Sequence, residues 1–232
     1  MIDTLEQRLA TVRSKVAQAC ADAGRDPSEV TLVAVSKMKP ASAIQQALAA
    51  GQLHFGENYA QHLRDKAVEL GIGPVVGQAP PLPCWHFIGP LQRNKVKYVV
   101  GTAALIHAVD NEKLGQAIAT RSGGRSSGIL VQVNIGREDT KHGVAPEQAL
   151  ALCRTLAGMP GIALKGLMCI PPVADEAPTR GWFLAMAELA AEGRAQGLPL
   201  DHLSMGMSHD YELAIACGAT HVRVGTAIFG AR

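Results

Sequence analysis

The sequence has 232 residues, of which 47% are hydrophobic and 18% are charged, and its formal net charge is +2. This apolar content can build a folded core and excludes global disorder. The near balance of charge argues against electrostatic binding of nucleic acid or membranes, and the 4% aromatic content argues against base stacking. We therefore expect neither nucleic acid nor a membrane among the partners.

The cysteines and the N-terminus indicate a cytoplasmic protein. The first residues contain no apolar segment of the kind found in signal peptides. No cysteine pair lies at a metal-ligand spacing such as C-x-x-C, so we expect reduced, mostly buried thiols and no metal site. The five cysteines are Cys20, Cys84, Cys153, Cys169 and Cys217.

The first predicted element is a helix over residues 3–24, because apolar side chains recur there at spacings of three and four. Asp3 with Glu6 resembles a capping pair. A strand over 31–36 follows, and its nearly continuous apolar character is typical of a strand buried on both faces. Further strands are predicted at 53–56, 85–89, 105–109, 129–135, 164–168, 202–205 and 221–225. Helices are predicted at 41–50, 58–70, 92–100, 111–122, 146–157, 179–196 and 209–217.

Eight strands alternating with helices predict an α/β fold, a TIM-type parallel (β/α)₈ barrel that forms a single domain over residues 1–232. An open doubly wound sheet is the alternative, although no G-x-G-x-x-G follows the first strand. No full helix is expected after the eighth strand, so the N-terminal helix is predicted to cover that seam and complete the outer ring. The Pro- and Gly-rich segment 71–83 is predicted to be a long loop at the end of the barrel away from the active face.

Active sites in such barrels lie at the C-terminal ends of the strands. Lys37 follows the first strand and shares parity with Val33 and Val35, so its side chain is expected to point into the barrel mouth. A solvated surface lysine is one interpretation. The functional interpretation is a Schiff-base lysine whose amine attacks an aldehyde.

The loops after the seventh and eighth strands often form a phosphate site in barrels of this kind. Met207-Ser208 and Gly225-Thr226 supply small residues and two hydroxyls there, and a helix starting near Ser208 would add its positive end. In the alternative interpretation, Ser208 only caps that helix and Gly225 only turns the chain.

Arg223 lies on the eighth strand, where an arginine is seldom buried without a partner. Either it forms an ion pair with a core carboxylate, or it donates a hydrogen bond to a ring atom of a ligand. Most of the histidines on or beside strands are interpreted as structural residues with hydrogen-bond partners rather than as catalysts. The five histidines on or beside strands are His54, His86, His107, His202 and His221.

A Schiff-base lysine, a phosphate site and a buried arginine together suit pyridoxal 5′-phosphate. The sequence resembles the pyridoxal phosphate homeostasis proteins, small single-domain relatives of the alanine racemase barrel. Seven blocks that run through nearly the whole chain carry the resemblance: VAVSKMKP (34–40), FGEN (55–58), WHFIGPLQRNK (85–95), VNIGREDTKHG (133–143), GLMCIPP (166–172), LSMGMSHD (203–210) and VRVGTAIFG (222–230).

The resemblance implies that Lys37 carries the cofactor covalently and that Arg223 faces the pyridine nitrogen. It implies that the loops at Ser208 and at Gly225-Thr226 hold the phosphate, and it places Asn58 near the cofactor. Tyr59-Ala60 and Arg137 depart from the commoner family pattern beside these positions, which affects access of partners or ligands more than cofactor binding.

The implied function is to buffer or deliver pyridoxal phosphate in vitamin B6 and amino-acid homeostasis without substantial turnover, so no catalytic residue is expected. Pyridoxal-phosphate-dependent apoenzymes are the implied recipients. Two alternatives stay open. One is a racemase-like pyridoxal enzyme, although the racemases that resemble this barrel carry an additional C-terminal β domain. The other is a Schiff-base aldolase that uses the same lysine without a cofactor.

Overall fold

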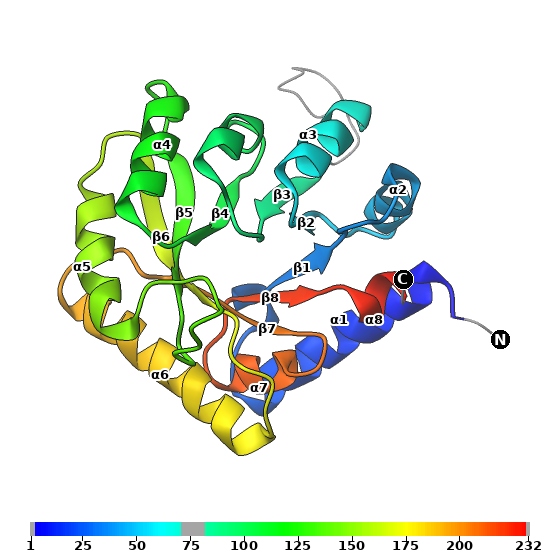
Figure 1. Cartoon of the computed structure of the whole chain (residues 1–232). Helices are drawn as coiled ribbons and strands as arrows, with labels where there is room; N and C mark the ends of the chain where they lie inside the picture. Colours follow the sequence, from blue (N-terminus) through cyan, green and yellow to red (C-terminus); the bar gives the residue numbers. More distant parts are fainter. Residues whose placement is uncertain (1–2, 71–81, 231–232) are drawn as a thin grey trace.

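Strand β1 (Thr31–Val35) pairs in parallel with both β2 and β8, which closes eight strands into a barrel. The strands follow one another around the barrel in sequence order, as the computed structural model of residues 3–70 and 82–230 shows (Figure 1). The predicted (β/α)₈ barrel is therefore confirmed and the open sheet is excluded. The other strands are β2 (His54–Glu57), β3 (Cys84–Phe87), β4 (Leu105–Val109), β5 (Ser127–Val133), β6 (Ile162–Cys169), β7 (His202–Met207) and β8 (His221–Val224).

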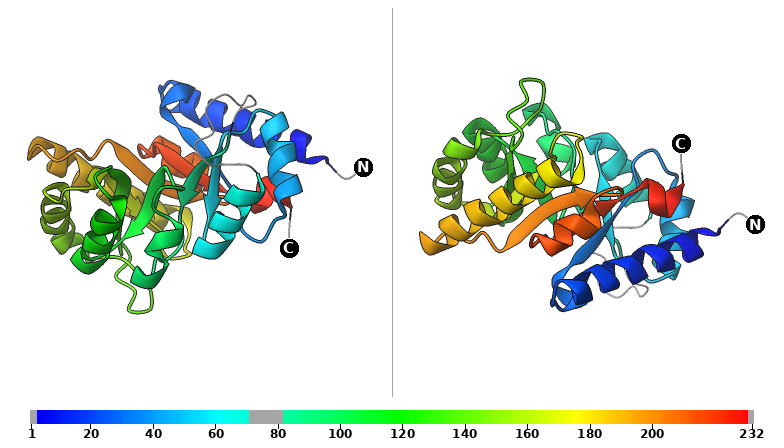
Figure 2. Two further views of the ribbon diagram at one scale, coloured as in Figure 1. Left: turned by 90° about the horizontal axis from the view of Figure 1, so that it is seen from above. Right: turned by 90° about the horizontal axis from the view of Figure 1, so that it is seen from below.

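Helices surround the barrel on its outside (Figure 2). None of the helices within residues 3–70 and 82–230 has both the length and the apolar character needed to cross a lipid bilayer. They are α1 (Leu5–Asp22), α2 (Ala41–Ala49), α3 (Ala60–Glu69), α4 (Glu112–Ser122), α5 (Pro146–Ala157), α6 (Glu176–Ala195), α7 (Tyr211–Ala216) and α8 (Thr226–Phe229), with 3₁₀ turns η1 (Pro27–Glu29) and η2 (Arg93–Tyr98).

Helix α1 covers the seam beside β8, as the sequence predicts. It lies along α7 and α8 (Figure 1) and also packs against α2. Arg8 Nε donates to the carbonyl of Ile228 at 2.8 Å. The predicted cap is wrong by one residue. Thr4 is the N-cap, and its side chain and that of Gln7 form the reciprocal capping box, because a threonine hydroxyl can accept the exposed N–H three residues on.

Most other predicted boundaries differ from the structure by one to three residues, and three of the differences concern helices. The expected helix over 92–100 is the 3₁₀ turn η2, and α7 begins two residues later than expected. Helix α6 begins at Glu176 rather than at 179, since Pro178 lies in its first turn, where a missing N–H costs nothing. The predicted loop over 71–83 lies almost entirely outside the described residues.

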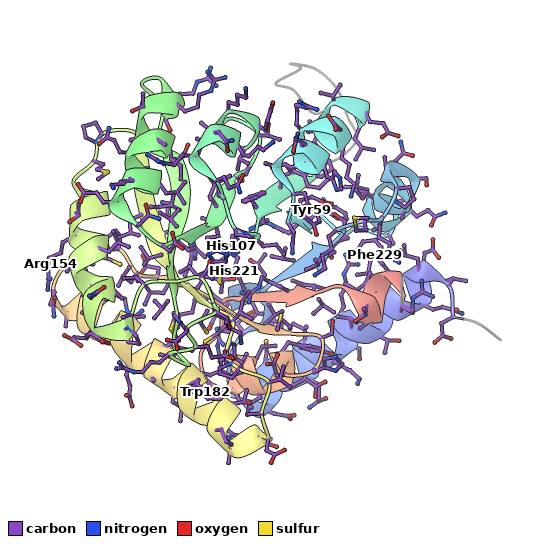
Figure 3. All side chains as sticks on the ribbon, in the orientation of Figure 1. Tyr59, His107, Arg154, Trp182, His221 and Phe229 are labelled. Atoms are coloured by element: carbon purple, nitrogen blue, oxygen red, sulfur yellow. The ribbon has the colours of Figure 1, made fainter. Side chains whose placement is uncertain are left out.

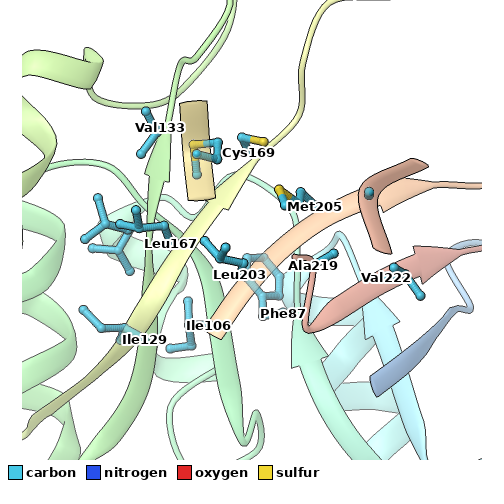
Figure 4. Packing of buried hydrophobic residues seen from close by; sticks show 14 of the residues in the cluster. Phe87, Ile106, Ile129, Val133, Leu167, Cys169, Leu203, Met205, Ala219 and Val222 are labelled. Carbon is cyan, nitrogen blue, oxygen red and sulfur yellow. The ribbon is translucent and has the colours of Figure 1, made fainter. Parts of the chain in front are cut away.

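The main core lies between the strands and the helices. Phe87, Ile106, Leu203 and Met205 are buried in this layer (Figure 4). The space inside the barrel holds two further groups of side chains. A small apolar cluster of Leu105, Ala108, Leu130 and Met168 is separate from the main core, and hydrogen-bonded histidines from β2, β3 and β4 form a second group. A polar barrel interior is therefore available to position side chains at the barrel mouth.

Candidate functional site

Lys37 lies in the turn that follows β1, at the C-terminal end of the barrel. The turn is closed by the Lys39 N–H, which donates to the Ser36 carbonyl at 3.0 Å. Lys37 itself is half-buried, whereas Met38 is exposed and has a positive φ of 62°. The turn thus separates a half-buried Lys37 from an exposed neighbour.

The buried ion pair of Glu57 and Lys66 contacts this turn at Ser36. Glu57, fully buried at the end of β2, accepts from the Ser36 hydroxyl at 2.6 Å and from Lys66 Nζ at 2.6 Å. Lys66 Nζ also donates to the Ser36 carbonyl at 2.8 Å. Two charged side chains from β2 and α3 therefore fix the backbone directly before Lys37.

Ser208 accepts hydrogen bonds from the other donors of the predicted phosphate site. Its Oγ accepts from the backbone N–H of Gly225 at 3.3 Å and from the Thr226 hydroxyl at 3.3 Å. The interpretation of Ser208 as only a helix cap is wrong, because α7 begins at Tyr211, with Asp210 as its N-cap. Two hydroxyls and one amide from the loops after β7 and β8 meet at one point.

The pairing of β1 with β8 brings this group next to Lys37. Val33 lies opposite Arg223 in the register, and Ala34 lies opposite Val224. One step further along, a Cβ built on Gly225 would lie 3.3 Å from Val35 Cβ, so only a glycine allows the two chains this approach without adjustment. Lys37 therefore follows β1 directly beside the Ser208 group.

Arg223 is buried inside the barrel and holds a fixed orientation. Its Nη1 donates to Ser204 Oγ at 2.6 Å, and its Nη2 donates to the Cys169 carbonyl at 2.9 Å. The interpretation as an ion pair with a core carboxylate is wrong, because both acceptors are neutral oxygens. Burial lowers the pKa of Arg223, an effect that Cys169 and Asp210 oppose. Met207 lies opposite Arg223 in the register, so β7 and β8 carry the two residues side by side.

Asn58 follows β2 and borders a cavity of about 630 Å³ at the same end of the barrel. Its backbone lies tight against Gly89, where a Cβ would come within 2.3 Å of the Asn58 carbonyl oxygen. Asn58 Oδ1 is buried and has no hydrogen-bond partner among the described residues. Tyr59 is 53% exposed at the cavity edge, as expected for a residue that faces solvent or a partner.

A row of hydrogen bonds runs inside the barrel from its N-terminal end to Arg223. His54 Nδ1 lies 2.9 Å from His86 Nε2, and His86 Nδ1 lies 2.9 Å from His107 Nε2. His107 Nδ1 lies 2.8 Å from Ser204 Oγ, which also accepts from Arg223. Figure 3 labels His107 near the centre of the barrel, beside His221. His221 Nδ1 lies 2.9 Å from Thr220 Oγ1, so four of the five histidines on or beside strands have a hydrogen-bond partner among the described residues.

Burial keeps these imidazoles neutral. It lowers the pKa of His86 to about 3 and that of His221 to about 2, and neighbouring histidines add to both shifts. The pKa of the fully buried His107 is also lowered well below its ordinary value. The row therefore consists of neutral rings, each with one donor and one acceptor nitrogen.

Sequence reasoning did not assign the Glu57–Lys66 pair or the histidine row. The one available signal was a charged residue, Glu57, at the end of an apolar strand, where burial without a partner is rare. The partner Lys66 belongs to the next helix, and the histidines come from separate strands. Only the three-dimensional arrangement of these elements joins them.

The whole chain is similar to known proteins. Residues 8–232 match the family described as alanine racemase, N-terminal domain. The chain is 42% identical to the pyridoxal phosphate homeostasis protein of Pseudomonas aeruginosa, over 100% of this chain and 97% of that protein. It is 40% identical to the Escherichia coli K12 protein of the same name, over 100% and 98% of the two chains.

Solved structures agree with this result. PipY of Synechococcus elongatus with PLP bound has a TM-score of 0.83 and 38% identity, covering 98% of this chain and all of PipY. The seven sequence blocks, the closed barrel and the full-length similarity lead to one assignment. The chain belongs to the pyridoxal phosphate homeostasis protein family, whose fold is that of the alanine racemase N-terminal domain.

Proposed function

We propose that this chain holds pyridoxal 5′-phosphate covalently on Lys37 and buffers or delivers it, without substantial turnover of a substrate. The observation that carries the proposal is the position of the Lys37 turn beside the Ser208 group, which the β1–β8 pairing imposes. The PLP-bound structure of the 38% identical PipY and the names of the curated relatives support it.

The residues present suit the cofactor at three points. Ser208, Thr226 and the Gly225 amide offer hydrogen-bond donors to a phosphate. Lys37 offers an amine that can bond to the aldehyde carbon, with loss of one water molecule. Asn58 Oδ1, buried without a partner, is a polar atom that a bound ligand could satisfy. The Met207 backbone completes the loop that carries Ser208.

Arg223 is expected to weaken the ring as an electron sink, although an arginine at this position does not by itself forbid turnover. Bound pyridoxal phosphate supplies an electrophilic aldehyde and an electron-withdrawing ring. An arginine keeps its proton and can only donate, so a ring nitrogen facing Arg223 stays unprotonated and the ring withdraws electrons weakly. Ser204 and the Cys169 carbonyl hold the guanidinium in place for this role.

Borohydride reduction followed by peptide mass spectrometry tests the covalent site. We expect a pyridoxyl group on Lys37, and we expect Lys37→Ala to abolish both this adduct and the visible absorbance of the cofactor. Lys39→Ala is the matched control, because Lys39 Nζ contacts the Gly230 carbonyl at 3.3 Å and its loss should change neither signal. An adduct on Lys39 or Lys95 would refute the assignment. A colourless protein without an adduct would favour the cofactor-free aldolase.

One observation favours a racemase-like enzyme as the second candidate. Tyr59, Asp110 and His142 line the cavity beside Asn58, and one of them could supply the second acid or base that racemisation requires. The test is hydrogen–deuterium exchange at Cα of several amino acids, followed by NMR. Exchange faster than about 1 per second, which is typical of enzymes, would replace the carrier function. Exchange far below that rate supports it.

The recipients and the compartment are part of the same proposal. We expect pyridoxal-phosphate-dependent apoenzymes to take up the cofactor and the protein to act in the cytoplasm. The five cysteines are all free thiols, and four of them are buried, which fits a reducing compartment. Transfer is measured as recovery of activity when an apoenzyme is mixed with the loaded protein. A rate equal to that of spontaneous release would argue against direct delivery.

A further inference from the structure

Three side chains with metal-binding atoms converge at the N-terminal end of the barrel, opposite the Lys37 site. His54 begins β2, Cys84 begins β3, and the two residues lie opposite each other in the strand register. His86 lies two residues beyond Cys84 and therefore on the same face of β3. One ligand atom of each residue lies within 4.8 Å of those of the other two.

We propose that His54, Cys84 and His86 form a binding site for a divalent transition-metal ion of the Zn²⁺ class. Two imidazoles and one thiolate are donors that Zn²⁺ prefers. His54 and Cys84 are half-buried, whereas His86 is buried, so an ion can enter from the outside and meet a sheltered third ligand. Three protein ligands leave a fourth tetrahedral position for water.

The interatomic distances are close to those of a tetrahedral site. His54 Nδ1 and His86 Nε2 are 2.9 Å apart, and Cys84 Sγ is 4.0 Å from His86 Nε2. A tetrahedral Zn²⁺ with Zn–N of about 2.0–2.1 Å and Zn–S of about 2.3 Å spaces these pairs roughly 3.4 and 3.6 Å apart. These two separations therefore have to change by only about half an ångström, within reach of a χ rotation of the side chains, and the third pair, His54 with Cys84, lies within 4.8 Å.

The hydrogen bonds behind the ligands suit a bound metal. A metal-binding histidine usually donates its other N–H to a fixed acceptor. With a metal on His86 Nε2, His86 Nδ1 carries the proton and donates to His107 Nε2 at 2.9 Å. His107 then donates from Nδ1 to Ser204 Oγ at 2.8 Å. Both rings have a single consistent tautomer in this arrangement.

Binding of the ion would replace the thiol proton of Cys84, which is released to solvent. The resulting thiolate would neutralise one of the two charges of the ion.

Without a metal, the histidines can also form a complete set of hydrogen bonds. If His86 Nε2 carries the proton, it donates to His54 Nδ1, and His107 donates from Nε2 to His86 Nδ1. Ser204 then donates to His107 while it accepts from Arg223. The direction of the His54–His86 hydrogen bond in the metal-free protein depends on the tautomers, whereas a bound metal requires an unprotonated His86 Nε2. The chemical shift of this nitrogen is therefore a readout independent of affinity.

Cobalt(II) is the spectroscopic probe for the test. Chelator-treated protein is titrated with Co²⁺, and difference spectra are recorded to remove any cofactor absorbance. We expect saturation at one equivalent, with the strong visible d–d bands of four-coordinate Co²⁺ and a thiolate-to-cobalt charge-transfer band. Added Zn²⁺ should displace the cobalt and remove both bands. Nitrogen-15 NMR should show the His86 Nε2 resonance shifting on Zn²⁺ binding, as expected for a nitrogen that becomes a metal ligand.

Cys84→Ser and His54→Gln are the informative variants. Cys84→Ser should remove the charge-transfer band. Each variant should weaken cobalt binding at least about tenfold, because removing a residue that only hydrogen-bonds to a metal ligand already lowers metal affinity by about that factor. The controls Cys217→Ser and His62→Gln, which lie outside the cluster, should leave both signals intact. Circular dichroism checks that each variant is folded. Absence of saturable binding, or a thiolate band that persists in folded Cys84→Ser, would overturn the proposal.

Discussion

Lys66 Nζ lies 2.6 Å from Glu57 Oε1, and both charged groups are buried beneath the turn that carries Lys37. Glu57 Oε2 has no hydrogen-bond partner among the described residues, so Lys66 and Ser36 supply the stabilising contacts of the carboxylate. The pair therefore links the stability of the fold to the geometry of the candidate site.

We predict that Glu57→Gln lowers the free energy of unfolding by about 3–5 kcal/mol, because the ammonium group of Lys66 is left buried without a counter-charge. The double variant Glu57→Gln, Lys66→Met should recover most of this loss, since it removes the second charge as well. Urea denaturation measures both changes. If the free energy of unfolding of Glu57→Gln lies within about 1 kcal/mol of the parent value, the buried ion pair contributes no more to stability than an exposed salt bridge.

The Ser208 group gives a prediction about affinity. Ser208→Ala together with Thr226→Ala should weaken pyridoxal phosphate binding by roughly 1–3 kcal/mol, because two donors to a charged group are lost while the Gly225 amide stays. Pyridoxal, which lacks the phosphate, should bind much more weakly than pyridoxal phosphate and should be insensitive to the double change. Titration followed by absorbance measures both ligands. Equal affinities in the parent protein would exclude an anion site here.

His221 gives a prediction about pH. Its pKa is about 2 in the folded protein because of burial, with His86, His202, His54 and Arg223 adding to the shift, against about 6.5 unfolded. The neutral ring therefore stabilises the fold above pH 6.5, and this contribution falls by about 1.4 kcal/mol for each pH unit below it.

The measurement compares metal-free parent protein with His221→Met in urea at several values between pH 7.5 and 5. The parent should lose stability more steeply on acidification, because methionine fills the space without binding a proton. Parallel slopes would mean that His221 accepts its proton inside the folded barrel.

Gly89 and Gly181 form a matched pair. A Cβ at Gly89 would come within 2.3 Å of the Asn58 backbone, whereas nothing lies within 4 Å of a Cβ at Gly181 in α6. Gly89→Ala should therefore displace Asn58, lower stability and weaken cofactor binding. Gly181→Ala should raise stability by about 0.5–1 kcal/mol, as expected inside a helix. Thermal unfolding and cofactor titration measure both effects. If Gly89→Ala changes neither stability nor cofactor affinity, the backbone at the end of β2 can move to accommodate the added methyl group.

The barrel could be predicted because its evidence is local. Eight apolar runs separated by helical periodicity require no knowledge of distant contacts, and strand order followed from the handed alternation of strands and helices. The positions of Lys37, Ser208 and Arg223 followed in the same way, since the ends of parallel strands meet at one face. Their role in cofactor binding stays a prediction.

The features that the sequence did not reveal depend on register and on side-chain direction. The spacing of Cys84 from His54 has no pattern of its own, and only the pairing of β2 with β3 places the two residues side by side. Lys66 belongs to a helix, and the sequence pattern of that helix does not show that the Lys66 side chain faces Glu57. Likewise, the true cap Thr4 could not be separated from Asp3 by residue type alone.

The position of α1 over the seam also determines the order in which the protein can be assembled. Contacts such as Arg8 to Ile228 and the pairing of β1 with β8 join residues about 190 to 220 positions apart in the sequence. Closure of the barrel must therefore wait until β8 has left the ribosome, and such long-range contacts slow folding. Until then Lys37 lies on a strand that has not yet paired with β8, so the proposed anion site is assembled only when the barrel closes.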